Sequence, residues 1–249
     1  MKNSVKKISE IINQSNRIVV ISGAGISTQS GISDYRGTDG IWSKYKPIPY
    51  DEFITSREAR VESWQRKGAL YSELKKAQPN LSHRAVAYLK DKGLLKAVVT
   101  QNVDGLHQAS GIESESIIEL HGNATKAACV QCNKNFALQD VLDEFEVSKE
   151  PPICDACGGF VKTATISFGQ AMSQRALMNA TDAARSCDLF LVLGSSLVVY
   201  PAANLPLIAK DNGAVLVIIN YQSTAFDTLA DVVMHDEIGG VLGQVLNFS

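Results

Sequence analysis

The sequence has little that would direct the chain to a membrane or to nucleic acid. None of its apolar runs reaches the roughly 18 residues that a membrane span needs. The N-terminal segment is amphipathic, whereas a secretory signal would have an unbroken apolar region. A formal net charge of -2 offers no basic field for nucleic acid, and the chain has no low-complexity tract or repeat. We therefore expect a soluble, cytoplasmic protein that binds neither nucleic acid nor membrane directly.

Cysteine is sparse, but four of the five cysteines form two spaced pairs. Cys129 and Cys132 make one C-x2-C pair, and Cys154 and Cys157 make the other. In a reducing compartment such pairs bind metal or do chemistry more often than they form disulfides. Four thiolates complete a tetrahedral Zn²⁺ shell and leave no position open for substrate, so we predict a structural zinc. The alternative is a set of free or redox-active thiols.

Short apolar runs separated by helical patterns predict the fold. The 249 residues are enough for one large domain, or for one domain with a small insertion, which we favour. Helical patterns cover residues 83–92 and 202–210. An α/β fold with a doubly wound, mostly parallel, Rossmann-like sheet follows from this alternation. The predicted strands are residues 17–21, 96–99, 117–120, 189–193 and 214–219.

Polar clusters directly follow these predicted strands. In open α/β sheets, ligands bind beyond the carboxyl ends of the strands, so we expect the clusters to converge on one cleft. Glycines after the first strand allow close approach of a pyrophosphate. The third glycine of the dinucleotide fingerprint is replaced by Thr28, which disfavours a conventional dehydrogenase. The clusters are residues 22–25, 100–104, 121–122, 194–196 and 220–221.

Together, these motifs resemble the sirtuin family of NAD-dependent protein-lysine deacylases. The resemblance implies a Rossmann-like NAD-binding domain (residues 1–30, 78–127 and 164–249), a cofactor loop with a helical module (31–77), and a zinc module (128–163). It also implies NAD as co-substrate and an acylated-lysine protein or peptide as substrate. The matching motifs are residues 23–27, 31–37, 100–107, 120–122, both cysteine pairs, 168–169, 194–201 and 218–220.

The resemblance also implies roles for single residues. His121 and Asn102 are the implied catalytic residues. Ile166, Phe168 and Gly169 are the implied substrate contacts, with Phe168 lining the acyl-lysine tunnel. The implied cofactor-binding residues are Gly23, Ala24, Gly25, Thr28, Ile32, Asp34, Tyr35, Arg36, Gln101, Asn102, Val103, Asp104, His121, Gly194, Ser195, Ser196, Asn220 and Tyr221.

The expected chemistry needs a base of near-neutral pKa. Cleavage of the nicotinamide bond lets the acyl oxygen attack the ribose, and a ribose hydroxyl must then lose its proton. Histidine, with an unperturbed pKa of about 6.5, suits that step, and we assign it to His121. The implied products are nicotinamide, free lysine and O-acyl-ADP-ribose. Alternatives are an ADP-ribosyltransferase or NAD hydrolase on the same fold, and a non-enzymatic NAD sensor.

Some residues depart from the family pattern or carry a simpler interpretation. Ser33 and Tyr35 stand where the family commonly has proline and phenylalanine. Residues 64–71 lack the Tyr-x-x-Arg pair of succinyl-preferring and malonyl-preferring members, which favours acetyl or longer neutral acyl groups. We expect His83 to be a helix cap or a surface residue, and His107 to pack within a helix. The oligomeric state is left open.

Overall fold

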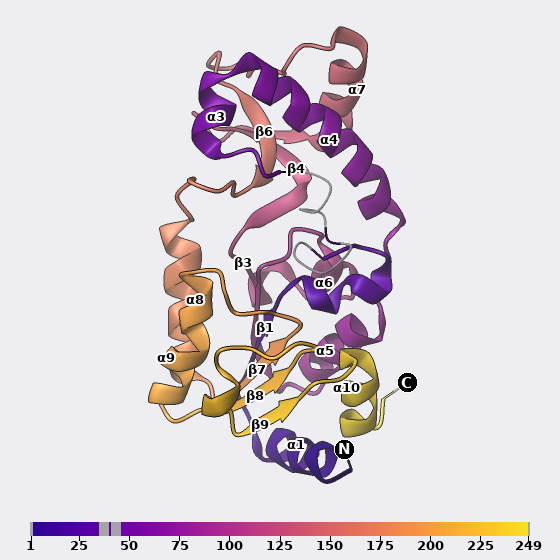
Figure 1. The fold of residues 1–249 in the computed structure, drawn as a ribbon, viewed down its shortest axis with the longest axis vertical. Coiled ribbons are helices and arrows are strands. Elements are labelled where there is room, and N and C mark those ends of the chain that lie inside the picture. The colour runs from indigo at the N-terminus through magenta and orange to yellow at the C-terminus, as the bar shows by residue number, and fades with distance from the viewer. Residues whose placement is uncertain (1, 35–39, 41–45, 249) are drawn as a thin grey trace.

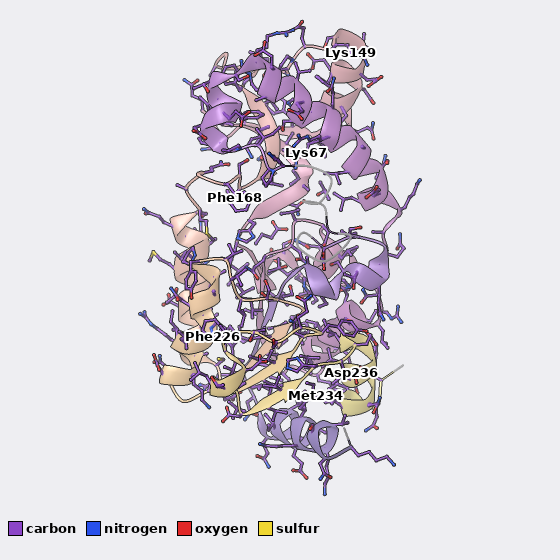
Figure 2. All side chains as sticks on the ribbon, viewed as in Figure 1. Lys67, Lys149, Phe168, Phe226, Met234 and Asp236 are labelled. Carbon is purple, nitrogen blue, oxygen red and sulfur yellow. The ribbon has the colours of Figure 1, made fainter. Side chains whose placement is uncertain are left out.

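A six-stranded parallel sheet forms the centre of the molecule (Figure 1). The structure is a computed structural model that describes residues 2–34, 40 and 46–248. All five predicted strands are present. A short edge strand, β9, follows them, and its last residue, Met234, is labelled in Figure 2. In the order β3-β2-β1-β7-β8-β9, the strands are Ile117–Glu119, Leu95–Thr100, Ile18–Ser22, Leu189–Leu193, Val215–Ile219 and Val232–Met234.

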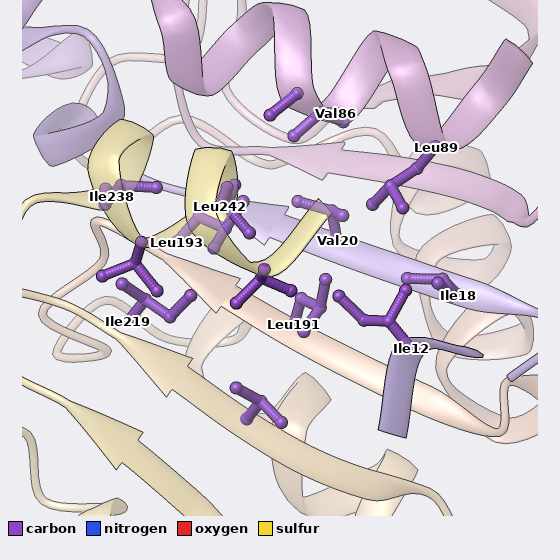
Figure 3. Close-up of a cluster of buried hydrophobic side chains, with 14 of the residues drawn as sticks. Ile12, Ile18, Val20, Val86, Leu89, Leu191, Leu193, Ile219, Ile238 and Leu242 are labelled. Carbon is purple, nitrogen blue, oxygen red and sulfur yellow. The ribbon is translucent and has the colours of Figure 1, made fainter. Parts of the chain in front are cut away.

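Both faces of the sheet are covered by helices, which explains why its strands are apolar throughout. Successive residues of β1 point to opposite faces: Val20 joins one buried cluster, and Val19 joins the other. Figure 3 shows the first cluster, where Ile12 and Leu242 pack near Val20. Helices α1 (Lys2–Gln14), α5 (Leu81–Asp91) and α10 (Ile238–Leu246) cover this face; α8 (Gln174–Ser186) and α9 (Leu205–Asp211) cover the other.

The two predicted helices begin at slightly different residues from those expected. Helix α5 starts at Leu81 because the Asn80 side chain accepts hydrogen bonds from the backbone N–H groups of Ser82 and His83. The other predicted helix starts as a 3₁₀ turn over Ala202–Asn204 and becomes α9 only at Leu205, with a proline in the first turn. Only the α5 difference arises from a capping side chain, because Asn204 at the start of α9 makes no side-chain cap hydrogen bond.

A smaller lobe lies at the far end of the molecule from α1 (Figure 1). Its antiparallel sheet has the order β5-β4-β6 (Asn135–Ala137, Gly122–Cys129 and Val161–Thr165). Helix α4 (Arg57–Lys76) packs on this sheet with α7 (Leu138–Ser148), and α3 (Tyr50–Thr55) precedes α4. The buried Trp64 joins α4 to β6, because its Nε1–H donates to the Val161 carbonyl at 3.2 Å. None of the helices in the described ranges combines the length and apolar character that crossing a membrane requires.

Gly122 lets β4 lie close against β6. Its φ is 75°, and a Cβ there would lie 2.0 Å from the carbonyl oxygen of Ala164. Alanine would therefore be strained by its own backbone conformation and would also push the two strands apart. Gly93 has a similar φ of 71°, but a Cβ at that residue would have no neighbouring atom within 4 Å.

We predict that Gly122→Ala costs at least about 3 kcal/mol in free energy of unfolding, because it combines backbone strain with an overlap. Gly93→Ala is the matched control and should cost only about 1–2 kcal/mol, from the backbone conformation alone. Urea unfolding of both variants measures the difference. An equal loss in the two variants would show that the contact with Ala164 is unimportant.

Candidate active site

One cavity of about 570 Å³ gathers the residues that the sequence pointed to. Its lining comes from the carboxyl ends of β1, β2, β7 and β8 and from the small lobe. Tyr35 and Arg36 lie outside the described residues. The predicted residues that line the cavity are Gly23, Ala24, Gly25, Thr28, Ile32, Asp34, Gln101, Asn102, Val103, Asp104, His121, Ile166, Phe168, Gly169, Gly194, Ser195, Ser196, Asn220 and Tyr221.

The glycine turn after β1 packs directly against the turn after β7. The backbone N–H of Gly25 donates to the carbonyl of Gly194 at 2.9 Å. A Cβ on Gly23 or on Gly25 would lie within 3 Å of the backbone around Gly194. These glycines are therefore required by backbone packing at the sheet edge, a reason that the sequence motif did not reveal.

The side chains around the cavity fit a dinucleotide. They offer amides (Gln101, Asn102 and Asn220) and carboxylates (Asp34 and Asp104), and hydroxyls are nearby in the turns after β1 and β7. Such groups complement ribose hydroxyls and a carboxamide by hydrogen bonding. A cavity of this size with a few convergent polar groups is also typical of cofactor sites. The donor set therefore suits NAD.

His121 is held by the backbone of the neighbouring strand end. Its Nδ1 lies 2.9 Å from the carbonyl oxygen of Gln101. A carbonyl oxygen only accepts hydrogen bonds, so we assign the ring proton to Nδ1, which makes Nε2 the acceptor in the neutral ring. The backbone carbonyl of His121 in turn accepts from the N–H of Ile166 at 2.8 Å. One residue thus links the end of β2 to the predicted substrate segment.

A buried hydrogen-bond network fixes Asn102 and Asp104. The Nδ2 of Asn102 donates to the Gly23 carbonyl and to the Ser27 hydroxyl, both at 3.1 Å, and Ser27 donates to Asp104 Oδ2 at 2.7 Å. Asp104 Oδ1 also accepts from the backbone N–H of Leu106, at the start of α6 (Leu106–Ala109). Burial raises the pKa of Asp104, while these hydrogen bonds oppose that shift. Asp104 therefore holds the first backbone N–H of α6 and also lines the cavity.

Two histidines lie beneath this network, fully inside the protein. His83 is 0% exposed, so its predicted position at a cap or on the surface is wrong; Asn80 caps α5 instead. His107 is buried in α6, as predicted, and its Nε2 lies 2.8 Å from the Ser22 hydroxyl. The two rings are 5.1 Å apart, and neither Nδ1 has a hydrogen-bond partner among the described residues. Burial lowers the pKa of His83 to about 4 and that of His107 to about 3.

Three further residues at the cavity carried no individual role in the sequence analysis. Ser27 lies within a matched motif, but only the structure shows that it connects Asn102 to Asp104. Lys67 on α4 and Lys162 on β6 line the cavity from the small lobe. A lysine in a helix or strand gives no sign of burial, so the sequence held no signal that would have identified them.

The four paired cysteines meet in the small lobe, and none of them lines the cavity. Their sulfur atoms all lie within 4.8 Å of one another. The Sγ atoms of Cys129 and Cys157 are 3.5 Å apart, and those of Cys132 and Cys154 are 3.7 Å apart. A tetrahedron with Zn–S bonds of about 2.3 Å has edges of about 3.8 Å, so this cluster fits a structural zinc.

We expect purified protein to contain about one zinc per chain, since a closed four-thiolate shell binds Zn²⁺ tightly. Cys132→Ser should lose the metal and destabilise the small lobe. Cys187→Ser is the matched control, because Cys187 is buried in the main core, outside the cluster, and its loss should leave the zinc content unchanged. Metal analysis with thermal unfolding tests this. A zinc content far below one, with chelator-insensitive folding, would contradict it.

The buried histidines predict a loss of stability in acid. In the unfolded chain each has a pKa of about 6.5, so between that pH and about 4 the unfolded state binds more protons than the folded state. The free energy of unfolding should therefore decrease as the pH is lowered from neutral, by about 2 kcal/mol per histidine at about pH 5. Urea unfolding at about pH 7.5 and about pH 5 measures this fall, which should be smaller in His107→Gln. An identical decrease in wild type and His107→Gln would show that His107 does not cause the loss of stability in acid.

Comparison with known proteins agrees with this geometry. A model described as "Sir2 family" matches residues 23–201. The chain is 46% identical over 243 residues to the NAD-dependent protein deacetylase of Rhodopseudomonas palustris, covering 98% of this chain and 96% of that protein. It is 47% identical over 243 residues to NAD-dependent protein deacetylase 1 of Bradyrhizobium diazoefficiens, covering 98% of this chain and 95% of that protein.

A solved structure described as "Sir2-p53 peptide-NAD+" superposes with a TM-score of 0.88 at 37% identity, covering 98% of this chain and 97% of that one. The chain belongs to the Sir2 family.

Proposed function

We propose that this protein is an NAD-dependent protein-lysine deacylase that removes acetyl groups from lysine in a protein or peptide. The observation that carries the proposal is the hydrogen bond from His121 Nδ1–H to the Gln101 carbonyl, at 2.9 Å. This bond leaves Nε2 as a proton acceptor in a side chain that lines the same cavity as the proposed cofactor and substrate residues. The named activity of relatives such as the R. palustris protein supports the same conclusion.

The residues at the sheet edge would hold NAD. When bound, NAD supplies the ribose carbon from which nicotinamide departs. We assign the phosphate and adenosine side to the turns around Gly25 and Gly194, with Asn220 on the adenosine. Gln101 and Asp104 would face the nicotinamide ribose, and Asn102, Ile32 and Asp34 would receive nicotinamide. Ser195 donates to the Gln101 side chain at 2.7 Å, which orients that amide.

His121 would move the proton that the acyl transfer requires. Its Nε2 would take the proton from a hydroxyl of the reacting ribose. The Gln101 carbonyl stabilises the imidazolium that results, because it continues to accept the hydrogen bond from Nδ1. Asn102 would keep the neighbouring pocket in shape through its bonds to Gly23 and Ser27.

Residues 166–169 would receive the acyl-lysine. Phe168 is 49% exposed and lines the cavity, and an exposed aromatic residue of this kind is well suited to contact a ligand. The N–H of Tyr50 fixes the Phe168 carbonyl at 2.8 Å. A solved Sir2 structure at 36% identity is described as bound to acetylated peptide, which supports a peptide substrate here. The predicted division into an NAD-binding domain, a helical module and a zinc module is part of this proposal.

Incubation with NAD and an acetyl-lysine peptide tests the function. Wild-type protein should release nicotinamide and deacetylated peptide together. His121→Ala should lower kcat by about 100-fold or more, because general base catalysis typically contributes that much. Its melting temperature and affinity for NAD serve as folding controls. Nicotinamide release without deacetylation would point instead to NAD hydrolysis or ADP-ribosyl transfer, and full activity in His121→Ala would refute the base assignment.

A further inference from the structure

Two lysines enter the cavity from facing elements of the small lobe. The bond from Trp64 Nε1–H to the Val161 carbonyl fixes α4 against β6. Lys67 lies one helical turn after Trp64 on α4, and Lys162 directly follows Val161 on β6. Both lysines line the cavity that also contains Phe168. Figure 2 shows Lys67 and Phe168 in the region between the small lobe and the central sheet.

Neither lysine has an acidic partner in the described part of the chain. The Nζ of Lys162, a residue only 5% exposed, donates to the Thr165 carbonyl at 2.5 Å and to the Ser167 hydroxyl at 3.2 Å. An ammonium group has three donors, so one is left. Lys67 makes no ion pair or hydrogen bond with any residue that the structure describes. The adjacent Arg66, in contrast, pairs with the Glu62 carboxylate.

Two largely buried cations without an anion are costly. Buried charges in proteins are normally paired, because removal from water disfavours the charged form. Burial, together with the positive charge of Lys67, lowers the pKa of Lys162 to about 7. Burial likewise lowers the pKa of Lys67. An anionic ligand between the two ammonium groups would relieve both effects.

The position of Lys162 indicates which part of the substrates would carry the negative charge. Its ammonium is bonded to Ser167, which lies between the proposed substrate contacts Ile166 and Phe168. The pyrophosphate of NAD, the other anion of the reaction, is assigned to the glycine turns after β1 and β7. The lysines belong to α4 and β6 of the small lobe. A negative charge carried on the acyl group itself therefore fits this position best.

We propose that Lys67 and Lys162 form an anion subsite for the acyl group, so that this protein removes acyl groups ending in a carboxylate, such as succinyl or glutaryl, more efficiently than neutral acyl groups of the same length. The inference rests on the proposed deacylase function and extends it beyond acetyl. It departs from the preference for neutral acyl groups that the missing Tyr-x-x-Arg pair suggested, because the lysines supply the positive charge from other positions. The overall reaction is unchanged: NAD, acyl-lysine and one water give nicotinamide, lysine and O-acyl-ADP-ribose.

Matched peptides on the full-length protein test this subsite. The same peptide sequence is prepared with acetyl, butyryl, succinyl, pentanoyl or glutaryl on its lysine. Succinyl has as many carbons as butyryl, and glutaryl as many as pentanoyl, so each charged group has a neutral partner. We expect kcat/KM for at least one charged group to exceed that of its partner by about tenfold or more, since charge-assisted hydrogen bonds are the strong ones. The affinity of each peptide for the protein without NAD should show the same preference.

Substitutions separate recognition of charge from a structural role. Lys67→Gln should lower kcat/KM for the charged acyl groups much more than for acetyl and so abolish the preference, whereas Lys67→Arg should retain it. Lys162→Gln should also lower the preference. Lys76→Gln removes an exposed charge from the same helix and should change nothing.

The outcomes distinguish this inference from the proposed function. Acetyl turnover without a preference for charged groups would overturn the subsite and leave the deacylase function standing. An equal loss of acetyl and succinyl turnover in Lys67→Gln would show that the lysine is structural, which also overturns it. Failure to turn over any of the acyl-peptides would contradict the deacylase function itself.

Discussion

The parallel pairing of β1 with both β2 and β7 is the constraint on which the site depends. Because these strands run in one direction, their carboxyl ends meet at a single edge, and the segments that follow them must share that space. This edge brings together residues that are far apart in the sequence, such as Gly23, Gln101 and Gly194. The helices on both faces hold the sheet rigidly, so the segments at its edge are held in place by a well-packed core.

The same edge combines chemical function with a structural cost. Asn102, Ser27 and Asp104 are connected by buried hydrogen bonds, which hold the proposed nicotinamide pocket in one shape. Beneath them, His83 and His107 each keep one ring nitrogen without a partner among the described residues. Buried polar atoms of this kind lower stability, and proteins tend to retain them where a functional site requires a particular geometry. The zinc cluster lies outside the cavity and would support the lobe that forms its other wall.

Much of the fold and site could be predicted from the sequence, because the relevant signals are local. Continuous apolar runs such as residues 189–193 identify strands that are covered on both faces, and the segments that follow them line the cavity. The spacing of the cysteines is equally local. The small antiparallel sheet could not be predicted this way, since β5 has only three residues and none of them is fully buried. The burial of His83 depends on His107, from another helix, and the environment of Lys67 depends on β6. Such contacts between distant segments leave no periodicity in the sequence.

The central claim is that the Gln101 carbonyl holds the Nδ1–H of His121 and so makes Nε2 the catalytic base. Nitrogen NMR of protein labelled with ¹⁵N at histidine, with His121 assigned by comparison with His121→Ala, measures this tautomer directly at a pH where the ring is neutral. The account predicts that Nδ1 carries the proton and that Nε2 is free of it. A neutral His121 protonated at Nε2 would contradict the assignment, because that nitrogen could then not accept a proton from the ribose.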